Sequence, residues 1–121
     1  MRAMICVVIP TDDERTVKLG HFGDAKYYLH FVYENGKWRL MEKVENPFKE
    51  DEDHGHEHAT MKKRKEILNL NERCDVFVYT FFGPGGEEFM KKHGKKVVHV
   101  EPKTSVEEAL KKVEEYLKAS S

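Results

Sequence analysis

Residues 26–44 read KYYLHFVYENGKWRLMEKV, and they decide the fold that we expect for the whole chain. The first part, 26–34, is rich in aromatic and β-branched residues, which favour strands. Asn35-Gly36 follows, and this dipeptide between two such runs is a strong signal for a two-residue hairpin turn. Residues 37–44 supply the returning strand. The stretch therefore predicts two antiparallel strands joined by a tight turn.

Strands and helices are expected to alternate on either side of this hairpin. Ala3 to Ile9 (AMICVVI) is a continuous apolar run that predicts a buried strand, and Pro10 is expected to end it. Further strands are predicted over 74–82 and 96–100, and helices over 59–70, 87–93 and the segment after Ser105. Parallel strand-helix-strand units need right-handed crossovers, while the hairpin needs one antiparallel member. The pattern predicts a single α/β domain over 1–121, a five-stranded mixed sheet with helices on both faces.

The last helix has the clearest signals. Ser105 and Glu108 have the spacing of a capping box, and apolar residues then recur at helical spacing. Gly94 fits the left-handed position after the preceding helix. Cys6 and Cys74 lie inside apolar runs, which predicts buried free thiols rather than a redox pair. His30, His93 and His99 are expected to be packed or half-exposed side chains.

Composition excludes some classes of function. The chain has 121 residues, of which 36% are charged, and its formal net charge is −1. A balanced charge gives no general attraction to nucleic acid or to an anionic membrane. No apolar run reaches the roughly 20 residues that a membrane-spanning helix needs. We therefore expect a cytoplasmic protein that binds neither nucleic acid nor membrane.

The expected strand directions bring three loops to one edge of the sheet. These are Gly20 to Gly23 (GHFG), Asn46 to His58, and Gly83 to Gly86 (GPGG). Open α/β sheets bind ligands at the carboxyl ends of their parallel strands. His21 between glycines is a candidate metal ligand, because imidazole is a common nitrogen donor for transition metals. Read by itself, it is more often an ordinary loop histidine.

The other two loops offer different donors. His54, His56 and His58 alternate within an acidic tract, so that in an extended backbone they project to one side and could share a metal ion. A flexible, solvated tract is the equally weighted alternative. The glycines of the 83–86 turn expose backbone N–H groups before a helix, where an anionic ligand could dock, although a plain tight turn has the same sequence.

Taken together, these segments resemble the dinitrogenase iron–molybdenum cofactor biosynthesis family, in its small stand-alone NifX/NafY-like form. The resemblance runs from about Met4 to Leu117. Five segments carry it, in chain order Ile5–Pro10, Gly20–Gly23, Glu45–Pro47 with the histidine loop, Phe82–Gly85 and Gly94–Val98. It implies a ribonuclease-H-like α/β/α fold with strand order 3-2-1-4-5 and an antiparallel second strand.

The resemblance also implies a function and a site. The expected function is non-enzymatic binding or carriage of an iron–sulfur or iron–molybdenum cluster or a transition-metal ion, with a cofactor-assembly protein as partner. The implied metal ligands are His21, His54, His56 and His58. With the glycine turn added as an anion-docking segment, the expected cofactor-binding residues are His21, Phe22, Gly23, Gly83, Gly85 and Gly86. No cysteine lies at this edge, so a cluster there would depend on nitrogen or oxygen ligands.

Two alternatives stay open at this point. A ligand-free interaction or regulatory domain would use the basic stretch from Lys62 to Lys65. A metal-dependent nuclease-like hydrolase would need carboxylates on strands that hold two divalent ions. The strand interiors offer only Asp75, at the opposite edge of the sheet, which disfavours hydrolysis.

Overall fold

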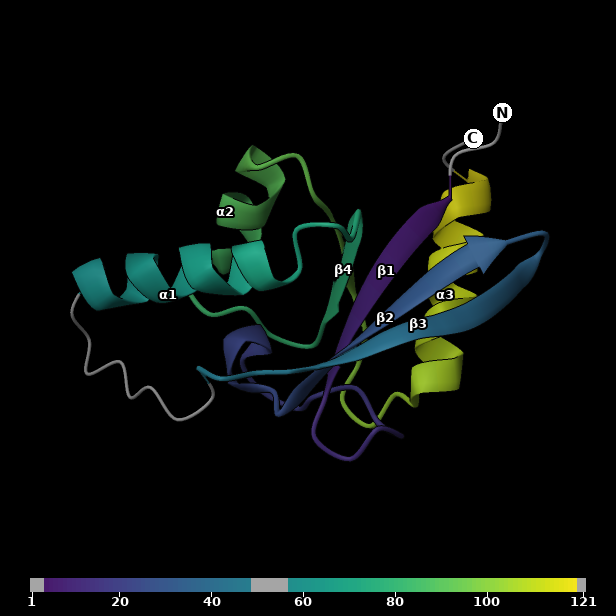
Figure 1. Ribbon diagram of the computed structural model, residues 1–121, viewed down its shortest axis with the longest axis horizontal. Helices are drawn as coiled ribbons and strands as arrows, with labels where there is room; N and C mark the ends of the chain where they lie inside the picture. Colours follow the sequence, from purple (N-terminus) through teal and green to yellow (C-terminus); the bar gives the residue numbers. More distant parts are fainter. Residues whose placement is uncertain (1–3, 49–56, 120–121) are drawn as a thin grey trace.

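The hairpin predicted from residues 26–44 is present in the computed structural model as strands β2 (Tyr27–Glu34) and β3 (Lys37–Glu45) (Figure 1). Asn35 and Gly36 have φ angles of 55° and 75°, and a type I′ turn requires positive φ at both positions. The structure describes residues 4–48 and 57–119, apart from the side chains of residues 57–60.

A five-stranded mixed sheet extends from this hairpin in the order β3-β2-β1-β4-β5. Strand β1 (Ile5–Thr11) pairs antiparallel with β2 and parallel with β4 (Val76–Tyr79). Strand β4 then pairs in parallel with β5 (Lys96–His99). This arrangement confirms the predicted strand order and the antiparallel second strand.

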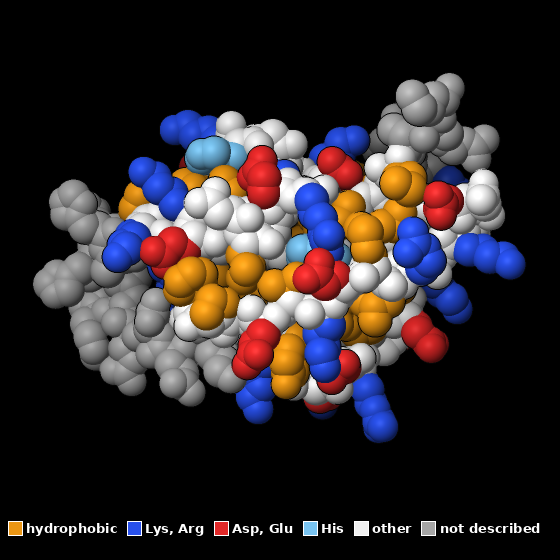
Figure 2. Space-filling model, in the orientation of Figure 1, with side chains coloured by type: hydrophobic (Ala, Val, Ile, Leu, Met, Phe, Trp, Pro, Cys, Tyr) orange, Lys and Arg blue, Asp and Glu red, His pale blue; other side chains and the backbone are white. Residues whose placement is uncertain are grey.

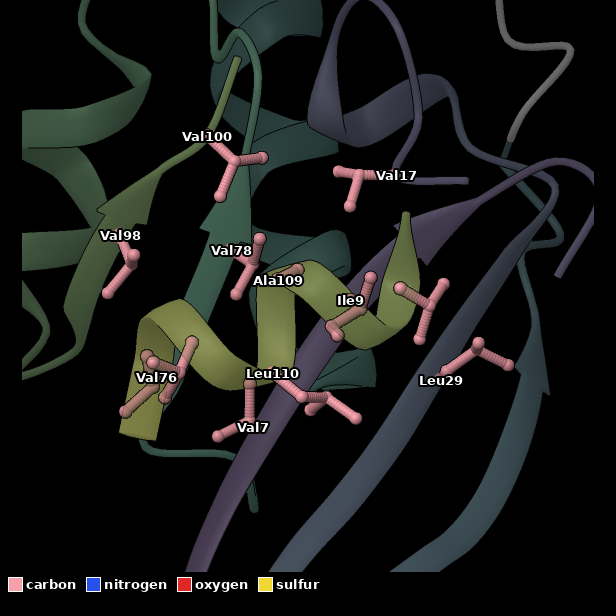
Figure 3. Close-up of a cluster of buried hydrophobic side chains, with 12 residues drawn as sticks. Val7, Ile9, Val17, Leu29, Val76, Val78, Val98, Val100, Ala109 and Leu110 are labelled. Carbon is pink, nitrogen blue, oxygen red and sulfur yellow. The ribbon is translucent and has the colours of Figure 1, made fainter. Parts of the chain in front are cut away.

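Helices cover both faces of the sheet and complete the three-layer α/β architecture (Figure 1). Helices α1 (Glu57–Leu70) and α2 (Gly86–Lys92) lie on one face, and α3 (Val106–Ala119) lies on the other. Figure 3 shows the core under α3, where Ala109 and Leu110 of the helix meet valine and isoleucine side chains of the central strands. None of the described helices is long and apolar enough to cross a bilayer.

Helix α3 begins at the predicted capping box. The Glu108 N–H donates to Ser105 Oγ at 3.0 Å, and the Ser105 N–H donates to Glu108 Oε1 at 3.0 Å. Both bonds satisfy donors that the first turn of a helix otherwise leaves without partners. Gly94, at a φ of +81°, likewise has the predicted left-handed conformation after α2.

The ends of β1 and β4 differ most from the sequence prediction. Pro10 does not end β1, because the strand continues to Thr11 and Pro10 pairs with Tyr28. On its other side, β1 pairs with β4 only at Val7 and Val8, so the missing N–H of Pro10 removes no bond there. Strand β4 is shorter than the predicted 74–82, because the residues after Tyr79 bend to form the edge of the sheet.

Positive and negative side chains are interspersed over the face shown in Figure 2. Lys and Arg number 21 against 22 Asp and Glu, and no single-sign field develops from such a mixture. The visible surface therefore lacks the broad basic stripe that proteins use to bind a nucleic-acid backbone.

Candidate functional site

The carboxyl ends of β1 and β4 lie at one edge of the sheet, and the loop of residues 20–23 is fixed there by Thr80. The Thr80 hydroxyl donates to the carbonyl oxygen of Lys18 at 2.7 Å and accepts the Gly20 N–H at 3.2 Å. His21 forms a β-bridge with Phe81, and the Phe22 N–H donates to the Phe81 carbonyl at 2.9 Å. The end of β4 and the glycine-flanked turn are thus adjacent, as their predicted strand directions require.

The end of β3 reaches the same edge through Asn46, a buried amide. Its Nδ2 donates to the carbonyl oxygens of Gly23 at 3.0 Å and Ala25 at 2.8 Å, and its Oδ1 accepts the Phe48 N–H at 2.9 Å. One side chain therefore satisfies three backbone groups from two segments. Asn46 is a positioning residue for the turn, although the sequence analysis identified it only as the first residue of the loop that ends at His58.

His21 presents an exposed imidazole at this edge. Its ring packs edge-on against Phe81, with ring centroids 4.8 Å apart. A Cβ atom on Gly83 would lie 2.9 Å from Cε1 of His21 and 3.0 Å from Nδ1, so only glycine fits beside the ring. Within the described part of the chain, no group exchanges a hydrogen bond with the imidazole. The ring is held by shape rather than by a hydrogen bond.

The other predicted residues of the turn have structural roles. Phe22 is only 2% exposed, and its ring stacks on Phe77 and contacts Phe82. Burial of an aromatic ring of this size makes it the anchor that holds His21 at the surface. Gly23 faces Lys63 and Ile67 of α1, which brings the helix close to the turn.

The turn of residues 83–86 lies beside His21, and the Arg64 side chain packs against this turn. A guanidinium nitrogen of Arg64 donates to the Pro84 carbonyl oxygen, and Arg64 also lies against Gly85. Gly86 packs on Phe82, because a Cβ there would lie 2.8 Å from the Phe82 Cβ. Two acidic residues, Glu87 and Glu88, occupy the first turn of α2. The positive charge near the glycines therefore comes from Arg64.

The histidine loop can be placed only in part. His54 and His56 lie outside the described residues. His58 belongs to α1, which begins one residue earlier at Glu57, but its side chain is not among those described. Their expected convergence with His21 stays a prediction.

Three aspartates at this edge, Asp12, Asp13 and Asp24, are already engaged with the protein. Asp12 accepts Lys18 Nζ at 2.7 Å and the Lys26 N–H at 2.9 Å, and Asp24 accepts Lys63 Nζ at 2.6 Å. The backbone N–H groups of Arg15 and Thr16 hold the pKa of the Asp13 carboxyl below its ordinary value. These hydrogen bonds fix the conformation of the loops. His21 differs from these aspartates, because its exposed side chain has no hydrogen-bond partner among the described residues.

A second group of potential ligands lies elsewhere, under the other end of α1. Cys6, His30 and Cys74 are all buried, and their donor atoms lie within 4.8 Å of one another. The prediction of buried thiols is correct, but the sequence reasoning missed their proximity. The signal that could have revealed it is strand register: β1 pairs with both β2 and β4, which brings Cys6 close to His30 and to the segment before β4.

Hydrogen bonds and burial fix the orientation of the His30 ring and shift the pKa values of the three side chains in this cluster. His30 Nε2 lies 2.7 Å from Asn71 Oδ1, and the Arg73 Nε–H donates to His30 Nδ1 at 3.0 Å. Burial lowers the pKa of His30, which favours the neutral ring. The hydrogen bond from Cys74 lowers the pKa of Cys6, while the same bond and burial raise the pKa of Cys74.

Solved structures with the same fold come from several microorganisms. The apo orange protein of Desulfovibrio gigas matches with a TM-score of 0.68 and 17% identity, covering 96% of this chain and 92% of its own. A Thermotoga protein proposed to be a NifB protein has a TM-score of 0.59 and 24% identity, covering 92% and 88%. A Methanocaldococcus jannaschii protein proposed to be a dinitrogenase has a TM-score of 0.51 and 20% identity, covering 84% and 79%. At such identities these likenesses show the fold alone.

The sequence itself decides the family. No curated protein matches the chain. The family model described as dinitrogenase iron-molybdenum cofactor, however, matches residues 3–116, a range that includes all five strands of the described sheet and the whole of helices α1 and α2. The chain therefore belongs to the dinitrogenase iron-molybdenum cofactor family.

Proposed function

We propose that this protein is a non-enzymatic binding or carrier domain for an iron–sulfur or iron–molybdenum-type cluster, and that His21 is its primary ligand. Family membership supports this class of cargo. The observation that carries the proposal is the His21 ring, which is exposed, fixed between Phe81 and Gly83, and without a hydrogen-bond partner among the described residues. An imidazole held in this way offers a nitrogen donor in a preformed orientation.

The surroundings of His21 suit a metal–sulfur cargo. The Phe81 ring that packs against the imidazole is 49% exposed, and Leu19, two positions before His21 in the chain, is 65% exposed, so this loop presents apolar side chains at the surface. Apolar surface of this kind favours the weakly hydrated sulfides of a cluster, while the guanidinium of Arg64 offsets negative charge on an anionic cargo.

The described carboxylates support binding rather than hydrolysis. Two-metal chemistry needs free carboxylates that face one another, whereas Asp12 and Asp24 are paired with lysines. Asp75 lies at the opposite edge, where its Oδ2 accepts the Cys6 N–H at 3.1 Å. The basic stretch of α1 is also partly engaged inside the molecule, because Lys63 bonds Asp24 and Arg64 bonds Pro84.

The test is uptake of a metal–sulfur anion by untagged protein. Tetrathiomolybdate is a suitable probe, since it supplies molybdenum and sulfide together, and binding is measured anaerobically by absorption and by elemental analysis after gel filtration. Loss of a residue that only supports a metal ligand typically weakens metal binding 10–100-fold. His21→Ala removes the proposed ligand itself, so it should weaken binding by at least as much. His93→Ala, which removes a histidine at the far end of α2, is the matched control and should bind like the wild type.

Equal uptake by His21→Ala and the wild type would overturn the assignment of His21. Cleavage of RNA by the wild-type protein with Mg²⁺ or Mn²⁺, abolished by removal of the metal, would contradict the non-enzymatic proposal.

A further inference from the structure

Three donors that soft metal ions prefer meet inside the core on the α1 side of the sheet. Cys6 is contributed by β1, His30 by β2, and Cys74 by the segment just before β4. All three are less than a tenth exposed, and their donor atoms lie within 4.8 Å of one another. The group is distinct from the His21 edge, because Cys6 is five positions before the end of β1, about 17 Å along an extended strand.

We propose that Cys6, His30 and Cys74 form a buried binding site for a single thiophilic metal ion, with Cu(I) the ion that this donor set favours. In trigonal coordination the metal–sulfur bonds are about 2.3 Å long and the metal–nitrogen bond is about 2.0 Å long. The three donor atoms around the ion are then roughly 3.7–4.0 Å from one another. The present separations allow this arrangement with side-chain adjustment alone. Thiolates select Cu(I) among the biological ions that accept three ligands.

The tautomer of His30 is already set for coordination. Arg73 Nε is only a donor, so His30 Nδ1 must accept its hydrogen bond, and in the neutral ring Nε2 must carry the proton that Asn71 Oδ1 accepts. Asn71 is itself buried and fixed, because its Nδ2 donates to the Ile67 carbonyl oxygen at 3.0 Å. A partner that orients the second ring nitrogen is a regular feature of histidine metal ligands.

Arg73 occupies the lone pair that a metal ion would need. Its side chain is 43% exposed and also pairs with Glu42, so it can leave His30 Nδ1 without disturbing the core. When Cu(I) binds, each thiol loses its proton to solvent and forms a metal–sulfur bond, and Nδ1 exchanges the Arg73 hydrogen bond for a metal–nitrogen bond. Two thiolates and one monovalent cation leave a single negative charge. The nearby cations Arg73 and Lys95 can offset this charge together with that of the neighbouring Asp75 carboxylate.

The chain makes sulfur ligation simple to detect, because Cys6 and Cys74 are its only cysteines. Reduced, untagged protein is titrated with Cu(I) without oxygen against a chromogenic Cu(I) chelator, after two free thiols have been counted in denaturant. The expected result is one Cu(I) per chain by native mass spectrometry, with a thiolate-to-copper charge-transfer band in the ultraviolet. X-ray absorption of the loaded protein should show two sulfur neighbours and one nitrogen neighbour.

Variants assign the ligands. Cys6→Ser and Cys74→Ser, each checked for folding by thermal unfolding, should lose the band and at least tenfold in affinity. His93→Asn, which removes a histidine outside the cluster, should retain the charge-transfer band and the wild-type affinity. Absence of Cu(I) uptake, a copper shell of nitrogen alone, or an unchanged charge-transfer band in the Cys6→Ser/Cys74→Ser double variant would each overturn the proposal. The X-ray absorption measurement keeps the proposal testable even if a cysteine variant fails to fold.

Discussion

Replacement of Gly83 by alanine should show how tightly the glycine turn holds His21. Gly83 has a φ of +82°, and a new Cβ would lie 2.9 Å from Cε1 of the His21 ring. An alanine in the left-handed region costs about 1–2 kcal/mol relative to glycine. Moving the ring off its preferred rotamer by roughly 30° costs about 0.5–1.5 kcal/mol more. The sum predicts that Gly83→Ala lowers the unfolding free energy by about 1.5–3.5 kcal/mol.

Gly94 supplies a matched control for the backbone part of this cost. Its φ is +81°, nearly that of Gly83, but a Cβ at this position would meet nothing within 4 Å. Gly94→Ala should therefore cost only the roughly 1–2 kcal/mol of the left-handed conformation. Urea denaturation followed by circular dichroism measures both values, provided that the m-values agree.

A double-mutant cycle with His21→Ala isolates the contact between the two residues. Without the imidazole, Gly83→Ala should cost no more than Gly94→Ala, and the cycle should give a coupling of about 0.5–1.5 kcal/mol. A coupling near zero, with Gly83→Ala no worse than Gly94→Ala, would refute the claim that Gly83 fixes the His21 ring.

Three further changes test other parts of the account. Asn46→Ala should destabilise the fold by about 2–3 kcal/mol by chemical denaturation, because it leaves buried carbonyl oxygens without donors; a loss below about 0.5 kcal/mol would contradict its bridging role. Phe22→Ala should cost about 3–5 kcal/mol by the same assay, as expected for an aromatic ring in the core, and a surface-like effect would contradict its burial. The Ser105 N–H lowers the pKa of Glu108, so this carboxylate stabilises α3 above its unfolded pKa and the effect is lost as pH falls through the lower, folded pKa. Glu108→Gln should therefore lose less stability than the wild type between about pH 5 and pH 3, and identical pH profiles would argue against the capping box.

Local chemistry made most of the fold predictable from the sequence. Asn35-Gly36 specified the hairpin, and the Ser105 and Glu108 pair marked the start of α3, because each pattern acts through bonds between near neighbours. The edge that carries His21 followed from strand directions alone. The prediction that Pro10 ends β1 was wrong. The missing N–H of a proline breaks a strand only where a neighbouring strand would accept its hydrogen bond, and β4 is too short to pair with β1 at Pro10.

The details of the sites depend on long-range packing, which a single sequence does not reveal. Gly83 could be recognised as a turn residue, but its contact with His21 links positions 62 residues apart and needed coordinates. Cys6, His30 and Cys74 are similarly distant in sequence and carry no spacing motif, so only the register of three neighbouring strands brings them together. The bonds of Asn46 to Gly23 and Ala25 were hidden for the same reason.

The central claim is that the His21 imidazole binds the cargo directly. This claim can be tested for each histidine separately by NMR. Protein labelled with ¹⁵N-histidine is titrated with tetrathiomolybdate without oxygen, and the nitrogen resonances of each ring are followed. We predict that a ring nitrogen of His21 shifts in a saturable manner while the resonances of His30, His93 and His99 stay in place. Saturable binding that leaves the His21 resonances unchanged would contradict the account.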